Sequence, residues 1–312
     1  MANILRHVRR TATQGAIRLV IGATGMLPLR TQRPVVRSLI GLSGSVPWLR
    51  RRVRENMQLA LGRDVPADAE RLYFQHVAWS MSHALEVFHN GLKNTSVPDE
   101  VTFDETIQIL DRAVAEGRGV LLTAAHWIGH ELAAGCIAHR HPVVMLVREA
   151  PTQERTARKL KWYAALGAET VLRPSGALPV KDAVTYLKIL KQGKLLAMTP
   201  DLLTSAEYGI DVSLFGRTAR LNGGAFALAL AAGAPIVRTY GHWLSESRGQ
   251  IRFERAADIE PGKRDVMIHA ALQDWCRWFE RTVRANPENW LFWLDKHWTR
   301  YLRASPRLPE IS

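Results

Sequence analysis

A histidine and a glutamate five positions apart are the first residues of this sequence that could do chemistry together. His126 and Glu131 follow an apolar, β-prone run, Val120–Ala125, and precede a stretch of small and apolar residues that favours a helix. A neutral imidazole can take a proton from a hydroxyl group, and a nearby carboxylate can fix the tautomer that leaves the other nitrogen free. The pair therefore predicts a histidine general base supported by an acid.

The spacing of the pair limits where its two members can lie. Residues five positions apart on one helix point about 140° apart, so the two side chains cannot meet if both are helical. They can meet if His126 lies in the loop before the helix and Glu131 lies in its first turns. The alternative is a histidine that caps the helix and only satisfies backbone groups.

The elements that must position this pair begin near residue 119, where strand-like and helix-like stretches start to alternate. The expected strands are Val120–Ala125, Val143–Val147, Glu169–Leu172, Leu195–Thr199, Ile236–Tyr240 and Gln250–Glu254, with helices near 130–140, 154–166, 179–192 and 220–233. Strands separated by such helices form βαβ units. We therefore predict an α/β fold with a mostly parallel central sheet flanked by helices. His126 then falls at the carboxyl end of a strand, where ligands bind in open α/β sheets.

Further helices are expected on both sides of this region. They cover residues 54–61, 66–90, 101–116 and 264–285. Five of the ten tryptophans follow residue 270, namely Trp275, Trp278, Trp290, Trp293 and Trp298. They fit either core packing or an aromatic belt at a membrane interface.

The positive charge of the chain is concentrated at its N-terminal end. Residues 1–54 contain eleven arginines and no lysine, aspartate or glutamate, which accounts for +11 of the net charge of +13. Apolar residues interleave with these arginines, as in a helix that lies in a membrane interface. Anionic lipid headgroups or nucleic-acid phosphates could bind such a segment. We predict a basic amphipathic membrane-associating segment over residues 1–54 and a single α/β domain over residues 55–312, with an anionic membrane surface as the partner rather than nucleic acid.

Several kinds of site have no signature in the sequence. It contains no glycine-rich dinucleotide or nucleotide loop, no Gly-x-Ser-x-Gly elbow and no Cys-x-x-Cys pair. Cys136 and Cys276 lie in apolar or aromatic surroundings and fit buried thiols in a reducing compartment. His126, His130 and Glu131 lack the usual third ligand of a zinc site, so no metal is expected.

Four separated motifs, in order, resemble the lipid A late acyltransferases of the lysophospholipid acyltransferase superfamily. They are the His126–Glu131 pair, Met198–Asp201, Gly209–Gly216 and Asn286–Trp293, preceded by a similar helix at Arg54–Leu61. The sequence departs from the family pattern at Leu202–Leu203, where a second carboxylate is missing, and at Asp295, where a histidine or arginine is common.

The resemblance implies an acyltransferase. Such an enzyme moves a fatty acyl chain from a thioester on acyl carrier protein or coenzyme A to a hydroxyl of a membrane glycolipid such as a lipid A precursor. His126 would be the general base and Glu131 would hold its imidazole. No cofactor is implied beyond the acyl-ACP or acyl-CoA co-substrate, and the expected location is the cytoplasmic face of the inner membrane, in a peripheral or monotopic state.

Other polar residues are candidates for binding substrate or the reacting oxyanion. Backbone amides at the start of the helix that carries Glu131, or Arg148, could stabilise an oxyanion. The substrate-binding candidates are Arg148, Asp201, Asp211, Arg217 and Arg220. Two rival functions stay open, an acyl-thioester hydrolase and a nucleic-acid-binding protein that uses the arginine-rich segment.

Overall fold

The computed structural model describes residues 22–62, 65–173, 180–204, 209–245 and 248–304 of the chain. Within them, a seven-stranded sheet has the strand order β1-β9-β8-β2-β5-β3-β4, and β6 and β7 form a separate antiparallel hairpin. The strands are β1 (Val101–Phe103), β2 (Val120–Ala124), β3 (Val143–Arg148), β4 (Glu169–Arg173), β5 (Leu195–Met198), β6 (Ile210–Leu214), β7 (Arg217–Leu221), β8 (Ile236–Ser245) and β9 (Arg248–Arg255).

The sheet is mostly parallel. Strands β8, β2, β5, β3 and β4 run parallel to one another, and β9 returns antiparallel beside β8. The predicted α/β fold with a mostly parallel central sheet is therefore confirmed.

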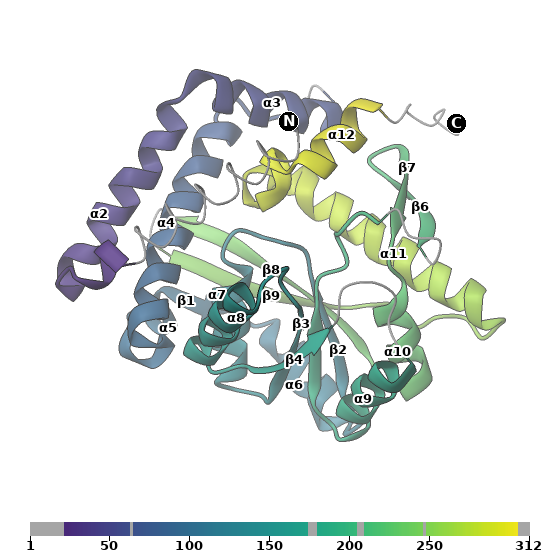
Figure 1. The fold of residues 1–312 in the computed structure, drawn as a ribbon. Helices are drawn as coiled ribbons and strands as arrows, with labels where there is room; N and C mark the ends of the chain where they lie inside the picture. The colour runs from purple at the N-terminus through teal and green to yellow at the C-terminus, as the bar shows by residue number, and fades with distance from the viewer. Residues whose placement is uncertain (1–21, 63–64, 174–179, 205–208, 246–247, 305–312) are drawn as a thin grey trace.

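Helices cover both faces of this sheet (Figure 1). Those described are α2 (Leu29–Gly41), α3 (Pro47–Leu61), α4 (Ala69–Asn90), α5 (Val97–Glu100), α6 (Ile107–Ala115), α7 (His130–Ala138), α8 (Gln153–Leu166), α9 (Val180–Lys191), α10 (Gly224–Ala232), α11 (Arg264–Ala285) and α12 (Lys296–Ala304).

Alternate residues of β2 face opposite sides, as expected for a strand. Val120 and Leu122 pack with α4, α6, α7 and α8, whereas Leu121 packs with α10 and α11. Both faces of β2 are thus buried.

Two sequence expectations fail at boundaries. The helix expected over residues 101–116 is the short strand β1 followed by α6, and the helix expected from residue 220 begins at Gly224 because β7 runs to Leu221. Strand β1 forms because it pairs with β9, and a turn at Asn222-Gly223 precedes α10. The spacing of apolar residues in the sequence indicates neither feature.

The N-terminal helices are packed onto the α/β body. Helix α2 lies beside α4 (Figure 1), and the guanidinium of Arg33 binds Glu86, Glu100 and His83. Val53 and Met57 of α3 are fully buried in the core. The expected domain boundary between residues 54 and 55 falls inside α3. The division into a membrane-associating segment and an α/β domain stays a prediction.

The C-terminal tryptophans belong to the core. Each of the five is at most 2% exposed, and they pack against one another and against Phe215 and Phe279. The interpretation as core packing is correct, and the aromatic belt is excluded. Cys136 and Cys276 are buried free thiols.

A glycine pair before β2 tests how tightly the start of this strand is held. Gly117 and Gly119 both have positive φ, 70° and 69°. A Cβ at Gly119 would lie 2.2 Å from the carbonyl oxygen of Leu190, whereas one at Gly117 meets nothing within 4 Å. We expect Gly117→Ala to cost only the left-handed backbone penalty of about 1–2 kcal/mol. Gly119→Ala should lower the free energy of unfolding clearly more, because it adds a backbone clash. Urea unfolding of both variants measures the difference, and equal losses would contradict this account.

Candidate active site

His126 and Asp201 meet at the carboxyl edge of the sheet because their strands are neighbours in register. Thr123 of β2 pairs with Met198 of β5. His126 and Asp201 each lie three residues beyond these partners, so the two loops leave the sheet side by side. Parallel strand pairing thus brings together two residues 75 positions apart in the chain.

The carboxylate of Asp201 holds His126 at two points. Its Oδ1 accepts a hydrogen bond from His126 Nδ1 at 2.6 Å, and its Oδ2 accepts one from the His126 backbone amide at 2.9 Å. The indole of Trp290 donates to the same Oδ2 at 3.0 Å. Asp201 is fully buried, whereas the side chain of His126 is 19% exposed. A buried carboxylate with three donors is firmly held, and the imidazole keeps one side open.

This contact sets the tautomer of His126. A carboxylate only accepts hydrogen bonds, so Nδ1 must carry the proton and the lone pair of a neutral ring lies on Nε2. Burial works to lower the pKa of His126, but the charge and hydrogen bond of Asp201 outweigh it and leave the pKa above that of a free imidazole. For Asp201, burial works to raise the pKa, but its contacts with His126 hold it below the ordinary range. The pair is therefore an ionised acid supporting a basic imidazole.

The loop that carries His126 is fixed by the C-terminal segment. The amide of Ile128 donates to the carbonyl of Asn289 at 2.7 Å, and the amide of Leu291 donates to the carbonyl of His126 at 2.9 Å. The ring of Phe292 stacks on the His126 imidazole with centroids 4.3 Å apart. The conformation of this loop thus depends on residues more than 160 positions away.

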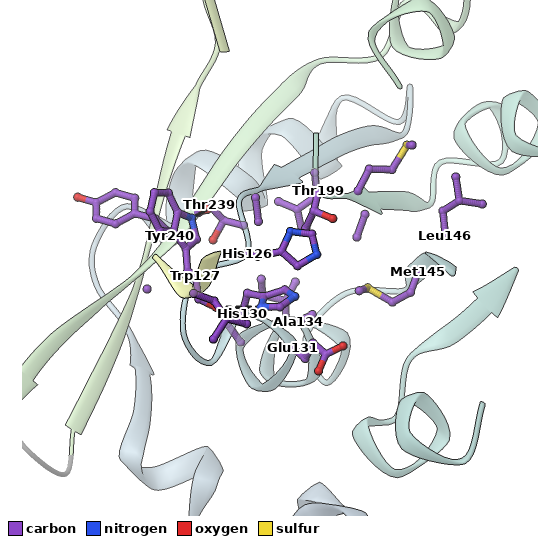
Figure 2. Close-up of a pocket in the computed structure, with 18 of the residues that line it drawn as sticks. His126, Trp127, His130, Glu131, Ala134, Met145, Leu146, Thr199, Thr239 and Tyr240 are labelled. Carbon is purple, nitrogen blue, oxygen red and sulfur yellow. Dashed lines mark hydrogen bonds between the residues drawn. The ribbon is translucent and has the colours of Figure 1, made fainter. Parts of the chain in front are cut away.

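An apolar cavity of about 260 Å³ opens beside His126 (Figure 2). We call it the histidine cavity. Its lining includes Leu122, Ala134, Ile137, Met145, Leu146, Ala197 and Met198, with His126, His130 and Glu131 among the polar residues. The cavity gives the free face of the imidazole access to a hydrocarbon-lined space, as expected for a site that handles an apolar substrate.

His130 is a second imidazole at this cavity. Its ring lies edge-on to His126 with centroids 5.0 Å apart, and its Nδ1 contacts the carbonyl of Trp127 at 2.8 Å. Burial and the nearby His126 lower the pKa of His130. A neutral ring that donates from Nδ1 adds no charge beside the base.

Glu131 does not hold His126, so that part of the sequence prediction is wrong. His126 does lie in the loop before α7 and Glu131 in its first turn, as the spacing requires. However, the Glu131 carboxylate accepts hydrogen bonds from Trp162 Nε1 at 2.8 Å and from the Tyr163 hydroxyl at 2.9 Å. Both donors belong to α8, and they direct the carboxylate toward that helix. Glu131 therefore ties α8 to α7 at the wall of the histidine cavity.

Three of the expected substrate-binding residues lie elsewhere. Asp211 and Arg220 are register partners in the β6–β7 hairpin and form an exposed ion pair at 2.7 Å. Arg217 is buried at the turn of the hairpin, where its guanidinium donates to the Phe215 carbonyl. None of the three lines the histidine cavity. None lines the second, adjoining cavity that is described below. The structure gives their predicted role no support, because Asp211 and Arg220 pair with each other and Arg217 bonds within the turn of the hairpin.

Arg148 and Asp201 are placed at the site, in different ways. Arg148 ends β3 and lines a second cavity, of about 510 Å³, that shares Leu146, Met198 and Thr199 with the histidine cavity. Asp201 was expected to bind substrate, but its carboxylate is fully occupied by His126 and Trp290. The amide of His130, near the start of α7, is also engaged, since it donates to the Trp127 carbonyl.

The partnership of His126 with Asp201 is the feature that sequence reasoning missed. Asp201 stood among the candidates because it follows a predicted strand and belongs to a family-like motif. The missing information was the strand order, which makes β2 and β5 neighbours across two intervening strands of sequence. His126 and Asp201 are equally far from the register partners Thr123 and Met198, but this register is a property of the folded sheet.

Metal-binding clusters and membrane-spanning helices are both absent from the described residues. No group of three or more His, Cys, Asp or Glu side chains in the described ranges could hold a metal ion. In the same ranges no helix combines the length and the apolar character needed to cross a bilayer.

Fold and site together define a parallel α/β enzyme with a carboxylate-supported histidine facing an apolar cavity. The sequence model of the family described as bacterial lipid A biosynthesis acyltransferase matches residues 6–300. The chain belongs to this family, and it is an acyltransferase. No curated protein matches it significantly.

The pKa of His126 provides a test of the His126–Asp201 contact that needs no substrate. We expect an NMR titration of the imidazole to give a pKa above that of free histidine. In Asp201→Asn the pKa should fall, because burial is then opposed mainly by the smaller effects of the more distant Glu131 and Asp295 charges. Glu131→Gln serves as the control and should shift the pKa less, since Glu131 makes no contact with the ring. An unchanged pKa in Asp201→Asn would contradict this assignment.

Proposed function

We propose that this enzyme transfers a fatty acyl chain from a thioester, carried by acyl carrier protein or coenzyme A, to a hydroxyl of a membrane glycolipid such as a lipid A precursor. The observation that carries the proposal is the 2.6 Å contact that holds His126 with its free nitrogen at an apolar cavity. Membership of the lipid A acyltransferase family supports the reaction class and a lipid A-like substrate.

In the proposed reaction His126 acts as the general base. Its Nε2 takes the proton from the acceptor hydroxyl while the hydroxyl oxygen attacks the thioester carbonyl carbon. The tetrahedral intermediate then collapses, the carbon–sulfur bond breaks, and the imidazolium returns its proton to the thiolate. Asp201 keeps Nδ1 protonated and stabilises the transient imidazolium, the role that a carboxylate plays in a hydrolase triad. The products are the acylated lipid and the free thiol, and no covalent enzyme intermediate is needed.

The histidine cavity is the proposed site of the donor acyl chain. Its wall is mainly aliphatic, and burial of methylene groups is favourable by about 0.8 kcal/mol each. Glu131 acts here as a positioning residue, since its bonds to Trp162 and Tyr163 hold α8 against the cavity.

Activity measurements on three variants test these roles. His126→Ala should lower kcat by ~10²–10⁴, the range for a lost general base. Asp201→Asn should also lower kcat and should move the acid limb of the pH–rate profile to lower pH, because the pKa of His126 falls. Glu131→Gln should leave that limb nearly in place and act mainly on binding of the acyl donor.

The assay follows the acyl group by mass spectrometry of the lipid and thiol products. Full activity of His126→Ala, or identical pH profiles for wild type and Asp201→Asn, would contradict the proposed mechanism. Thioester consumption that yields free fatty acid at an unchanged rate when lipid acceptor is added would instead identify a hydrolase.

The proposed membrane contact is the surface of α2, of the short 3-10 helix Leu42–Ser45 that follows it, and of the start of α3. Leu39, Leu42 and Trp48 are 57–63% exposed there. Arg50 and Arg51 are exposed on the same segment, where Arg50 also contacts Glu70 at 3.4 Å and Arg51 contacts Glu55 at 3.7 Å. Exposed apolar side chains among basic ones suit an anionic interface, where each basic residue contributes roughly 1 kcal/mol. We place the enzyme at the cytoplasmic face of the inner membrane, where it would reach its lipid acceptor.

Liposome flotation tests this surface in the full-length chain. We expect the double variant Leu39→Gln/Leu42→Gln to float less with anionic vesicles than wild type, because it loses the apolar part of the contact. Val266→Gln is the matched control, since Val266 is 63% exposed on α11. Equal losses for both variants, or none, would exclude α2 as the contact. Salt-sensitive binding to DNA or RNA instead of vesicles would favour the nucleic-acid alternative.

A further inference from the structure

Thr199 carries a hydroxyl group at the passage between the histidine cavity and the second cavity. It comes directly after β5, and together with Leu146 and Met198 it lines both cavities. The other two side chains are apolar, so Thr199 supplies the polar side-chain group of this shared wall. Figure 2 shows its hydroxyl beside the His126 imidazole.

The register of the sheet explains why this hydroxyl lies next to the histidine. Thr123 of β2 pairs with Met198 of β5, so the residues that follow them, Ala124 and Thr199, lie beside each other. His126 comes two residues after Ala124, and all three residues line the histidine cavity. The pairing that joins the two loops thus also places a hydroxyl one step below the imidazole.

The Thr199 hydroxyl has no hydrogen-bond partner among the described residues of the chain. A threonine hydroxyl can rotate about its bond to carbon and can donate one hydrogen bond to an acceptor in the cavity. The group is neutral, so such a bond adds no charge beside His126. This hydroxyl is therefore available to an oxygen atom of a substrate.

Several other donors around the histidine are already engaged. The backbone amides of His126, Ile128 and His130 all donate within the protein. The Nδ1 of His130 contacts a backbone carbonyl at 2.8 Å, so it carries the proton of the neutral ring and Nε2 can only accept. The Tyr163 hydroxyl donates to Glu131. None of these groups can donate to a substrate without breaking a bond that the protein already makes.

We propose that the Thr199 hydroxyl donates a hydrogen bond to the carbonyl oxygen of the acyl thioester and to the oxyanion formed from it. The inference rests on the proposed acyl transfer and adds a catalytic residue to it. When the acyl chain fills the histidine cavity and the carrier lies outside it, the carbonyl group between them falls at the passage where Thr199 lies beside His126.

The contact stabilises the transition state more than the bound thioester. Attack by the acceptor oxygen makes the carbonyl carbon tetrahedral and moves an electron pair onto the carbonyl oxygen, and a donor already in place then binds a full negative charge. Thr199 keeps its proton throughout. The electron pair returns to the carbonyl bond as the carbon–sulfur bond breaks.

Thr239 offers an internal comparison on the other side of Ala124. It is the register partner of Ala124 in β8, it lines the histidine cavity, and its buried hydroxyl has no partner within the described ranges. Unlike Thr199, it does not line the second cavity. Loss of the Thr239 hydroxyl should therefore affect the fit of the acyl chain more than the reacting carbonyl.

Steady-state kinetics compare Thr199→Val, Thr199→Ser and Thr239→Val, with Thr218→Val on the exposed face of β7 as the control for the substitution itself. Thr199→Val should lower kcat by ~10²–10³-fold, the cost of removing one oxyanion donor, and should change KM much less. Thr199→Ser retains the hydroxyl and should keep most of the activity. The acid limb of the pH–rate profile should stay in place in Thr199→Val, because Asp201 still holds His126.

Two kinetic outcomes would overturn the proposal. One is an equal loss of kcat in Thr199→Val and Thr199→Ser, which would show that the hydroxyl is not the group that matters. The other is a loss in Thr239→Val as large as that in Thr199→Val.

Infrared spectroscopy of the bound donor separates this contact from acyl transfer itself. The full-length enzyme is mixed with dodecanoyl-coenzyme A that carries ¹²C or ¹³C at the thioester carbonyl, without a lipid acceptor, and the difference spectrum isolates the carbonyl stretch. The stretch should lie at lower frequency in wild type and Thr199→Ser than in Thr199→Val, because a hydrogen bond weakens the carbonyl bond. This result is expected even if the assayed lipids are not acylated. An unshifted band in wild type, or the same shift in Thr199→Val, would overturn the role of Thr199.

Discussion

The buried carboxylate of Asp201 is the interaction on which the rest of this site depends. An ionised acid with no exposed surface is costly unless its oxygens are paired. Here His126 supplies a ring donor and a backbone donor, and Trp290 supplies an indole donor. The Asp201 carbonyl accepts a further indole, that of Trp298. The short loop after β5 therefore fixes both the loop that carries His126 and the C-terminal aromatic segment. The buried charge is tolerated because these three segments meet at Asp201.

Asp201 and Glu131, the two acids near His126, therefore have different roles. Asp201 is inside the protein and controls the protonation of the ring. Glu131 contacts α8 and controls the shape of the wall beside the ring. The Glu131 charge still favours a protonated His126 from a distance, but it follows burial and Asp201 in size. A His-x4-Glu motif thus marks this site without naming the direct partner of its histidine.

The surroundings of the histidine divide into spaces of different character. The histidine cavity is mainly apolar, whereas the adjoining second cavity is lined by Arg148 and Arg173 at the ends of β3 and β4. A thioester substrate is itself divided in this way, with a hydrocarbon chain on one side of the carbonyl and a polar carrier on the other. The exposed apolar and basic surface of α2 and α3 lies outside both cavities. In the proposed function, the reaction and the membrane contact therefore fall on separate elements of one fold.

The sequence by itself determined the α/β class, most strands and helices, the position of His126 after a strand and the candidates Arg148 and Asp201, because each leaves a local pattern of period or spacing. It left β1 and the β6–β7 hairpin unrecognised, since short strands take their identity from pairing. Only the tertiary structure decided that Asp201, rather than Glu131, holds His126, and that Arg148 stands beside Arg173. Both depend on strand order and register, β2 next to β5 and β3 next to β4. The order of strands in a sheet is set by the packing of helices and core side chains far apart in the chain, and no local spacing encodes it.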